Sequence, residues 1–476
     1  MKIKFGTSGW RDIIAENFTF ENVKLVTQAI ADYVNQKFAG QKKVIVGYDP
    51  RFLSEDFAKT SCCVLSANGI KSLYTKRDVP TPVVAYEIIS KKLAGGINFT
   101  ASHNPPEYNG LKFSPDWGGP ALPETTQFIE KACEELMSNR ERIKEMDYDE
   151  AKKKGLIEEI DPRQNFLKRI KQLVDIKSIK KAKLKVGVDL LYGTARGYLD
   201  ELLKECGCKI TVLHDWRDVL FGGHRPEPDE ENLKGLIDVV KKKKLNLGLS
   251  CDGDADRFGI VDSDGTFITP NQVIALLLYH LAKSRNYRGG IAVRSVMTSH
   301  FVDSIAKGYD VEVKETPVGF KFIGGIMVEN PDKFIIGGEE SGGLTIRGHV
   351  PEKDGVLACM LIAEMVAQEK KPIRKILQEL EKKFGKFITK RVNLSLTKEN
   401  MEKFREKLKS TPPEEFAGLK VKKLITIDGF KFILEDGSWV GMRLSGTEPI
   451  VRLYIESDTV KKVSELKSAG EKFITS

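Results

Sequence analysis

The chain has 476 residues, of which 41% are hydrophobic and 30% are charged, and its 76 Lys and Arg against 67 Asp and Glu leave a net charge of +9. This composition is typical of a soluble globular protein with about three or four domains. A modest basic excess suits a small anionic substrate, whereas the lack of a basic stripe with interleaved aromatic residues argues against nucleic-acid binding. The most apolar stretch, 273–282, is too short for a transmembrane helix.

The cysteines predict a reducing environment. There are 7 of them, an odd number, and their spacing fits neither a zinc site nor a disulfide framework. We therefore expect free thiols and a cytoplasmic location. The start of the chain reaches Trp10 without an apolar core segment, so no signal peptide is predicted.

The first part of the chain predicts a β-α-β unit. After a helix over 24–38, a strand at 44–49 and a helix at 55–67 lead to a second strand at 70–74. A further helix is predicted from Thr81-Pro82, and it leads to a strand at 96–99.

The same order of elements recurs twice further along. Strand 184–189 is followed by a helix that ends at Lys204 and by strand 208–212. Strand 290–293 is followed by helix 299–306 and strand 309–313. Similar units at such wide spacing predict repeated α/β domains rather than a short-period solenoid.

The last hundred or so residues differ from these units. A helix at 373–384, several short strands and a closing helix at 460–473 predict an α+β domain. The fold class is therefore α/β with four domains. We place their boundaries at 1–158, 159–262, 263–368 and 369–476.

A turn-rich loop at 100–112 holds the first candidate for a reactive residue, Ser102. It follows a predicted strand, which is where α/β proteins place reactive groups. Pro105-Pro106 stiffens the exit of the loop, and Asn109-Gly110 is predicted to turn the chain so that Lys112 approaches Ser102. The alternative, in which Ser102 only caps a turn, stays open on this stretch alone.

The segment Asp252-Gly253-Asp254-Ala255-Asp256-Arg257 predicts a metal site. Three carboxylates at alternating positions can converge on one hard cation such as Mg²⁺, and Arg257 could offset part of the charge of a bound phosphate. An EF-hand is excluded because its sixth position needs Gly, where this chain has Arg257, and its twelfth needs Glu, where this chain has Ser263. A predicted hairpin over 258–268 would close the site.

Two further loops favour sugar and phosphate binding. The glycine-flanked loop 337–343 carries Glu339 and Ser341, which can both bind vicinal hydroxyls. The loop that starts at Arg443 combines hydroxyls, backbone N–H groups and a second arginine, Arg452, which together suit a phosphate. A flexible surface turn and an ordinary β-turn are the respective alternatives.

Together these loops closely resemble those of the α-D-phosphohexomutase superfamily, the phosphoglucomutase and phosphomannomutase enzymes, from Gly6 to Arg452. That family folds as four domains around a central cleft. Three of its domains are related α/β units, and a smaller fourth domain binds phosphate. Its members are isomerases that transfer a phosphoryl group within a hexose phosphate.

The resemblance implies roles for particular residues. Ser102 would carry the catalytic phosphoryl group, and Asp252, Asp254 and Asp256 would bind Mg²⁺ with the phosphoserine as a further ligand. Basic residues near the transfer centre would be His103, Lys112, Arg11, Arg257 and Lys321. Substrate would be bound by Glu339 and Ser341 on the sugar, by Arg443, Ser445, Gly446, Thr447 and Arg452 on the non-reacting phosphate, and by His349, whose position only approximates that of a family histidine.

The implied reaction starts from phospho-Ser102, passes through a bisphosphorylated sugar that turns over in the cleft, and uses a hexose 1,6-bisphosphate as activator. Lys112 is our candidate general acid/base, because burial can lower the pKa of a lysine.

We expect a phosphoglucomutase. The alternatives are a phosphomannomutase or dual-specificity enzyme, then a phosphoglucosamine mutase, and outside the family a phosphatase or a non-catalytic sugar-phosphate-binding protein. Small-molecule sugar phosphates are the expected partners, with no membrane or nucleic acid, and the oligomeric state is not predicted.

Overall fold

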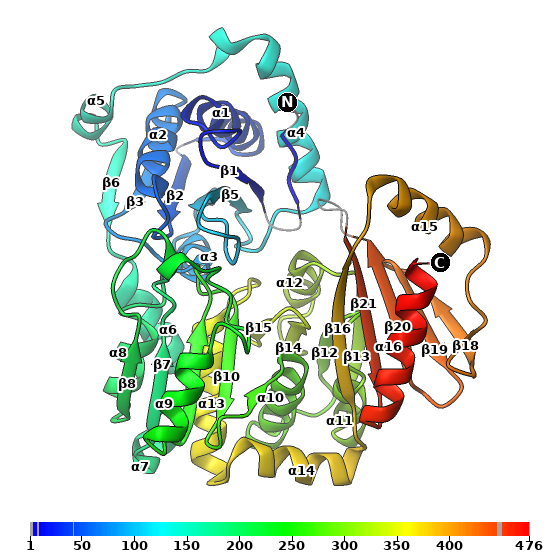
Figure 1. Cartoon of the computed structure of the whole chain (residues 1–476). Helices are drawn as coiled ribbons and strands as arrows, with labels where there is room; N and C mark the ends of the chain where they lie inside the picture. The colour runs from blue at the N-terminus through cyan, green and yellow to red at the C-terminus, as the bar shows by residue number, and fades with distance from the viewer. Residues whose placement is uncertain (1–2, 7–8, 41, 445–449, 476) are drawn as a thin grey trace.

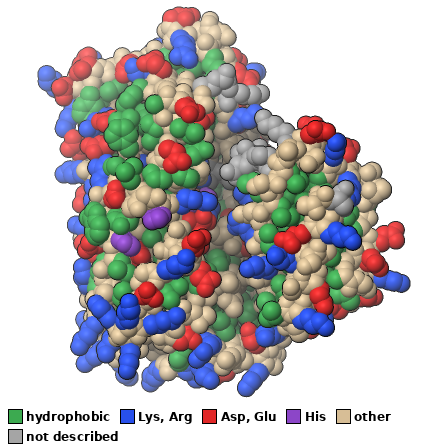
Figure 2. Space-filling model, in the orientation of Figure 1, with side chains coloured by type: hydrophobic (Ala, Val, Ile, Leu, Met, Phe, Trp, Pro, Cys, Tyr) green, Lys and Arg blue, Asp and Glu red, His purple; other side chains and the backbone are tan. Residues whose placement is uncertain are grey.

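The computed structural model describes residues 3–6, 9–40, 42–444 and 450–475. Four β-sheets follow one another along the chain, each with its own helices (Figure 1). The first three combine parallel strand pairs with helices, and the fourth is antiparallel. The predicted fold class is therefore confirmed. Figure 2 shows the surface hollowed between the fourth domain, at right, and the rest of the molecule, with charged side chains along the hollow.

The first sheet has the strand order β1-β5-β4-β2-β3-β6. Strands β4, β2, β3 and β6 are parallel neighbours, whereas β5 runs antiparallel to both β4 and β1. The elements of this domain are β1 (Trp10–Ile13), α1 (Phe20–Lys37), β2 (Lys42–Tyr48), α2 (Ser54–Ala67), β3 (Ile70–Thr75), α3 (Thr81–Lys91), β4 (Gly95–Phe99), β5 (Tyr108–Pro115), α4 (Pro123–Ser138), a 3-10 turn η1 (Arg140–Arg142), α5 (Tyr148–Lys153) and β6 (Ile157–Ile160).

The second sheet, β11-β10-β9-β7-β8, pairs β7 in parallel with β8 and β9 and adds β10 and β11 as an antiparallel hairpin. The hairpin over 258–268 is thus confirmed, but its turn lies at the end of the sheet opposite the Asp252 loop and does not close that loop. The elements are α6 (Arg163–Leu173), α7 (Ile176–Ala182), β7 (Lys185–Asp189), α8 (Leu199–Glu205), β8 (Lys209–Leu213), η2 (Phe221–Gly223), α9 (Lys234–Lys242), β9 (Leu247–Cys251), β10 (Phe258–Asp262) and β11 (Phe267–Ile268).

The third sheet has the order β13-β12-β14-β15, with β12 parallel to β13 and β14 and with β14 and β15 as a hairpin. Its helix α13 packs against β9 and β10 of the second sheet. The elements are α10 (Pro270–Ser284), β12 (Ile291–Ser295), α11 (Phe301–Gly308), β13 (Glu312–Thr316), α12 (Phe320–Glu329), β14 (Phe334–Glu339), β15 (Gly343–Ile346), α13 (Gly355–Glu369) and α14 (Ile373–Phe384).

The fourth sheet, β16-β21-β20-β19-β18-β17, carries α15 and α16. Its elements are β16 (Ile388–Ser395), α15 (Lys398–Ser410), β17 (Glu415–Phe416), β18 (Leu419–Ile425), β19 (Phe430–Leu434), β20 (Trp439–Leu444), β21 (Ile450–Ser457) and α16 (Val460–Thr475). The predicted domain boundaries stay a prediction. Strand β6 crosses the first of them, and α14 packs against α11 of the third domain.

The hydrophobic cores divide the molecule differently from the sheets. One continuous cluster joins side chains of the first three domains, among them Ile45, Val186, Leu344 and the whole apolar length of α13. The fourth domain has a separate core around Phe432, Leu453 and Leu466. Within the described residues, no helix is long and apolar enough to cross a membrane.

Candidate active site

The Ser102 loop connects β4 to β5 at the edge of the first sheet. Ser102 is buried and has a φ of 52°, a left-handed conformation that is uncommon outside glycine. Its N–H donates to Thr100 Oγ1 over 2.8 Å. Asn109 and Gly110 lie inside β5 rather than in a turn, so the predicted turn at these residues is wrong, although Lys112 does reach the site along this strand.

Arg51, which was not predicted from the sequence, stabilises this loop by hydrogen bonds to its backbone. The guanidinium is fully buried and its Nε donates to Asp49 Oδ2 over 3.1 Å. Its two Nη atoms donate to the carbonyl oxygens of Ser102, Asn104, Pro105 and Tyr108 over 2.7–3.0 Å. A planar guanidinium can satisfy several carbonyls at once because its donors point in fixed directions. The signal in the sequence was an arginine two residues after an aspartate at the end of a strand.

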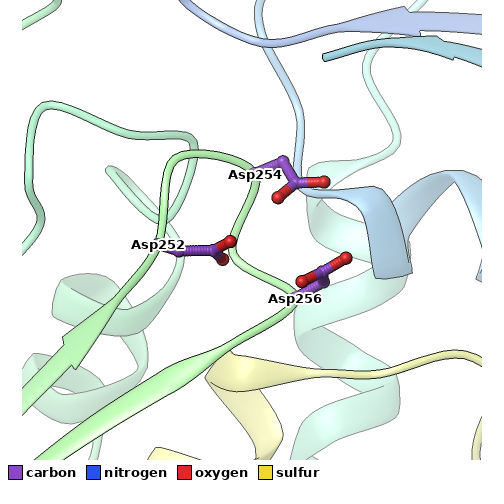
Figure 3. A group of neighbouring side chains, drawn as sticks. All are labelled: Asp252, Asp254 and Asp256. Carbon is purple, nitrogen blue, oxygen red and sulfur yellow. The ribbon is translucent and has the colours of Figure 1, made fainter. Parts of the chain in front are cut away.

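The three predicted metal ligands lie on the loop between β9 and β10 (Figure 3). Asp252, Asp254 and Asp256 are all buried, and one carboxylate oxygen from each lies within 4.8 Å of the others. Ser102 Oγ donates to Asp252 Oδ2 over 2.8 Å. A Cβ added to Gly253 would stand 2.8 Å from the Ser102 carbonyl oxygen, so glycine allows the two loops to approach. The structure thus brings Ser102 and all three aspartates together.

Two lysines neutralise part of this carboxylate cluster. Lys112 Nζ lies 2.5 Å from Asp254 Oδ2 and 2.8 Å from Asp256 Oδ2, and Lys353 Nζ lies 3.2 Å from the same Asp256 oxygen. The other oxygens, Asp254 Oδ1 and Asp256 Oδ1, are buried and have no hydrogen-bond partner among the described residues. Buried carboxylate oxygens without a partner are costly, and a hard cation would satisfy them. The donor set therefore fits Mg²⁺.

The pKa values of the carboxylates shift in opposite directions within this cluster. Burial together with Asp254 and Asp256 raises the pKa of Asp252 well above its usual range. Burial also works to raise the pKa of Asp256, but Lys112 and Lys353 hold it below its usual value. Opposite charges in direct contact outweigh desolvation here.

The expected lowering of the Lys112 pKa is wrong. Burial acts in that direction, but Asp254 and Asp256 contact the ammonium directly, and the pKa of Lys112 is raised. A lysine between two carboxylates keeps its proton more firmly than a free lysine. Lys353, which we had not placed at the site, shares this environment, and its pKa is raised as well.

The other basic residues surround the serine loop. Arg11 on β1 donates to Asn104 Oδ1 over 2.8 Å, and the Arg257 N–H donates to Asp252 Oδ1 over 2.9 Å. Arg257 also forms an ion pair of 3.2 Å with Glu227. Burial and the neighbouring Arg257 and Arg11 lower the pKa of His103 well below its usual value, so its imidazole is neutral.

The predicted sugar loop is the turn of the β14–β15 hairpin. Glu339 ends β14, and its Oε1 accepts the Gly319 N–H over 2.6 Å. Burial, with Glu340 nearby, raises the pKa of Glu339 to about 7. Ser341 lies in the turn itself and is partly buried. A Cβ on Gly343 would stand 2.1 Å from Lys353 Cδ, which places this hairpin directly beside the carboxylate cluster.

Two predicted residues lie at the margin of this arrangement. Lys321 is partly buried in the first turn of α12, where burial lowers its pKa. The His349 side chain has no solvent exposure, and its Nε2 lies 2.7 Å from Asp354 Oδ2. Asp354 is itself the N-cap of α13. The geometry therefore assigns His349 to packing beneath the site and gives no support to contact with a substrate.

The predicted phosphate site has two arginines on neighbouring strands of the fourth sheet. Arg443 on β20 and Arg452 on β21 are directly paired in the antiparallel register. Arg443 Nε lies 2.9 Å from Asp428 Oδ2, which also accepts the Val318 N–H over 3.0 Å. Asp428 thus links Arg443 to the third domain. Ser445, Gly446 and Thr447 lie outside the described residues.

Models of known families match nearly the whole chain. Residues 2–140, 164–265 and 269–384 match the α/β/α domains I, II and III of phosphoglucomutase/phosphomannomutase, and residues 392–470 match its C-terminal domain. The matches follow the order of the four sheets.

Whole-chain relatives agree with these matches. A phosphoglucomutase/phosphomannomutase of Thermococcus kodakarensis is 33% identical and covers 99% of this chain and 98% of its own. A provisionally named phosphoglucosamine mutase of Methanothermobacter thermautotrophicus is 30% identical, with 96% and 94% covered. A crystal structure from Thermus thermophilus, which carries a provisional phosphomannomutase name, has a TM-score of 0.86 at 30% identity, and each chain is covered completely.

Proposed function

Since the chain belongs to the phosphoglucomutase/phosphomannomutase family and is therefore a phosphohexomutase, we propose that it interconverts glucose 1-phosphate and glucose 6-phosphate through phospho-Ser102. The observation that carries this proposal is the hydrogen bond from Ser102 Oγ to Asp252, inside a buried carboxylate cluster with unsatisfied oxygens. A serine that only capped a turn would not need three buried aspartates beside it.

The reaction moves one phosphoryl group at a time. The bond from phosphorus to Ser102 Oγ breaks as a sugar hydroxyl attacks, and the proton of that hydroxyl passes to Ser102 Oγ, which gives a hexose 1,6-bisphosphate and a free serine hydroxyl. The sugar then turns over, Ser102 Oγ attacks its other phosphoryl group, and the serine proton passes to the sugar oxygen that leaves. A hexose 1,6-bisphosphate added as activator would restore Ser102 after loss of its phosphate.

The chain's charged groups would stabilise this transfer. Asp252, Asp254 and Asp256 would hold Mg²⁺, which when bound supplies positive charge to the phosphoryl oxygens. Lys112 and Lys353 add two ammonium groups at the same point, held there by Asp254 and Asp256. Such preorganised charges lower the barrier without rearranging during the reaction.

The two substrate loops explain how one site serves two orientations. Glu339 and Ser341 would bind the C3 and C4 hydroxyls, which roughly exchange places when the sugar turns over. Arg443 and Arg452 would bind the phosphate that is not reacting, in either orientation, because a guanidinium recognises a phosphate irrespective of the carbon that carries it. The neighbouring positions of these arginines on β20 and β21 support this assignment.

The preferred sugar is the finer part of the proposal. Glucose and mannose differ only at C2, whereas Glu339 and Ser341 would read C3 and C4. One hydroxyl contact is worth about 0.5–1.5 kcal/mol, so the preference would be up to about tenfold. Phosphomannomutase and then phosphoglucosamine mutase remain the alternatives, since relatives carry these names.

A coupled assay tests the assignment. We expect the highest kcat/KM for glucose 1-phosphate when the 1-phosphates of glucose, mannose and glucosamine are compared, each with its own 1,6-bisphosphate. Parity or a mannose preference would move the assignment to the alternative and leave the phosphoserine chemistry intact.

A further inference from the structure

A cavity lies at the end of the second domain remote from Ser102. It has a volume of about 650 Å³, which is within the usual range for small-molecule sites. Its walls come from α7, from the residues that flank β9 and β10, and from the connection between α13 and α14. Figure 1 places α7 and the end of α13 at the bottom of the molecule.

The charged side chains that line this cavity have one sign. Lys181, Lys370 and Lys371 line it, and no Asp or Glu does. Lys371 is engaged by Glu379 at 2.7 Å, but Lys181 and Lys370 have no ion pair among the described residues. A concave site whose charged lining side chains are all positive attracts an anion.

The rest of the lining suggests what the anion is attached to. Leu184, Val366 and Ala367 form a buried apolar floor. Asn246 accepts the Lys185 N–H with its Oδ1 over 2.8 Å, which leaves its amide hydrogens for another acceptor. Apolar surface with a few directed donors is the usual composition of a metabolite site.

Three elements connect this cavity to the aspartate loop. Strand β9 starts after Asn246 and ends at Cys251, next to Asp252, and β10 starts after Arg257 and ends at Asp262, next to Ser263. Helix α13 runs about 18 Å from Gly355, whose N–H donates to Ala255 O over 3.0 Å, to Ala367 on the cavity floor. Its residues from 355 to 367 are all buried, so the helix is packed along its length.

We propose that this cavity is a regulatory site for a phosphate-bearing metabolite with an apolar or aromatic part. Its phosphate would lie between Lys181 and Lys370, and its apolar part would cover Val366 and Ala367. Occupancy would shift the shared ends of β9, β10 and α13 and so alter the aspartate loop. The binding half is independent of the proposed function, whereas the regulatory half rests on it.

Pyridoxal 5′-phosphate is a suitable probe because it combines an aromatic ring, a phosphate and an aldehyde. Its aldehyde condenses with a lysine amine and releases water, and borohydride reduces the imine to a stable amine for peptide mapping. We expect Lys181 or Lys370 to be labelled at least about tenfold faster than Lys180, an exposed neighbour outside the cavity, with a rate that saturates as the probe is increased. Equal, non-saturating labelling of all three lysines would overturn the site.

Matched variants separate this site from the active centre. Lys370→Gln should slow the labelling of Lys181 several-fold, whereas Lys180→Gln should not, because only Lys370 would bind the probe's phosphate. Glucose 1-phosphate should protect lysines near Ser102 and leave Lys181 unprotected. Protection of Lys181 that matched that of Lys321 would overturn a separate cavity.

Turnover tests the regulatory half. Before reduction, the probe should change the Mg²⁺ concentration needed for half-maximal rate in the wild type, and not in the Lys181→Gln/Lys370→Gln double variant. An equal effect in both proteins would overturn the coupling. An enzyme without mutase activity that still showed selective, saturating labelling would refute the proposed function and keep the binding site.

Discussion

The candidate active site and the junction between the third and fourth domains each bury a lysine near acidic groups, yet they set its pKa in opposite directions. At the centre, Lys112 contacts Asp254 and Asp256 directly and its pKa is raised. At the junction, Lys431 on β19 is fully buried, and its pKa is lowered to about 7 by burial and by Arg294.

The partners explain this difference. Lys431 Nζ donates to the Val296 carbonyl over 2.7 Å and lies 2.9 Å from His300 Nε2, both uncharged groups, while its nearest carboxylate, Glu315, is 3.9 Å away. Burial and Lys431 lower the pKa of His300 to about 2, so the imidazole stays neutral. Direct contact with a carboxylate, rather than the degree of burial, decides which state of a buried lysine is favoured.

The largest expected effect tests whether catalysis takes place at the site of Lys112, which also contains Ser102, and not at the site of Lys431. Ser102→Ala removes the hydroxyl that Asp252 accepts, and we expect mutase activity to fall on the order of 10³-fold or more. Intact-mass analysis of the active wild type should find a phosphate that peptide mapping assigns to Ser102. Ser90→Ala, an exposed serine on α3, is the control. Full turnover by Ser102→Ala would refute the phosphoserine mechanism.

The second test changes the acidic partners of Lys112. Asp254→Asn removes one negative ligand, and we expect kcat/KM to fall roughly 10²-fold and the Mg²⁺ requirement to rise. Chelation should abolish turnover of the wild type, and added Mg²⁺ should restore it. Asp264→Asn is the control, because Asp264 lies on the turn between β10 and β11, at the other end of the sheet. It should leave kcat/KM and the Mg²⁺ requirement unchanged. Normal turnover by metal-free enzyme would show that the carboxylates serve another purpose.

The third test concerns Arg443. Like Lys431 it is a cation of the fourth domain, but it is proposed to bind substrate. Arg443→Ala should lower kcat/KM for sugar phosphates by about 1.5–3 kcal/mol in transition-state stabilisation, roughly 10–150-fold. Hydrolysis of phospho-Ser102 by water should change little, because water has no distal phosphate. Arg405→Ala on the exposed face of α15 is the control. Equal losses in both reactions would indicate misfolding.

The smallest effect belongs to Lys431 itself and appears in stability rather than in rate. Its pKa is about 7 in the folded chain and 10.5 ordinarily, so between these values the unfolded chain binds more protons. The free energy of unfolding should therefore rise with pH across this window, by about 1.4 kcal/mol per unit from this group.

Lys431→Met removes the titrating group and should remove this contribution. From pH 7.5 to 9 the wild type should gain about 2 kcal/mol relative to the variant in urea unfolding. Identical pH dependence in the two proteins would show that Lys431 reaches solvent or a carboxylate partner.

The sequence predicted the parts of the site that are local along the chain. The Asp252 loop and Ser102 were recognisable because each carries its chemistry within a few residues. Lys353 and Arg51 were not, because their roles depend on contacts with Asp256 and with the Ser102 loop, which only the packing of the sheets creates.

The errors have the same origin. Asn109-Gly110 reads as a turn, but the pairing of Gly110 with Arg11 on β1 draws it into a strand. The Lys112 pKa was expected to fall because the sequence shows a buried lysine without showing its two carboxylate partners. The role of His349 stays a prediction, and its contact with Asp354, which holds the ring in the interior, could likewise not be read from the sequence.

The shared core of the first three domains has a consequence for protein fragments. Helix α13 is encoded after the third sheet but completes the packing of the second, so a chain cut at residue 262 would lose the helix that covers β9 and β10. The last sheet and its two helices carry their own core, so a fragment starting near residue 388 should fold autonomously and melt in a separate calorimetric transition. In such a molecule the fourth domain can be exchanged between relatives by recombination, whereas the second and third domains, which share α13, must be inherited together.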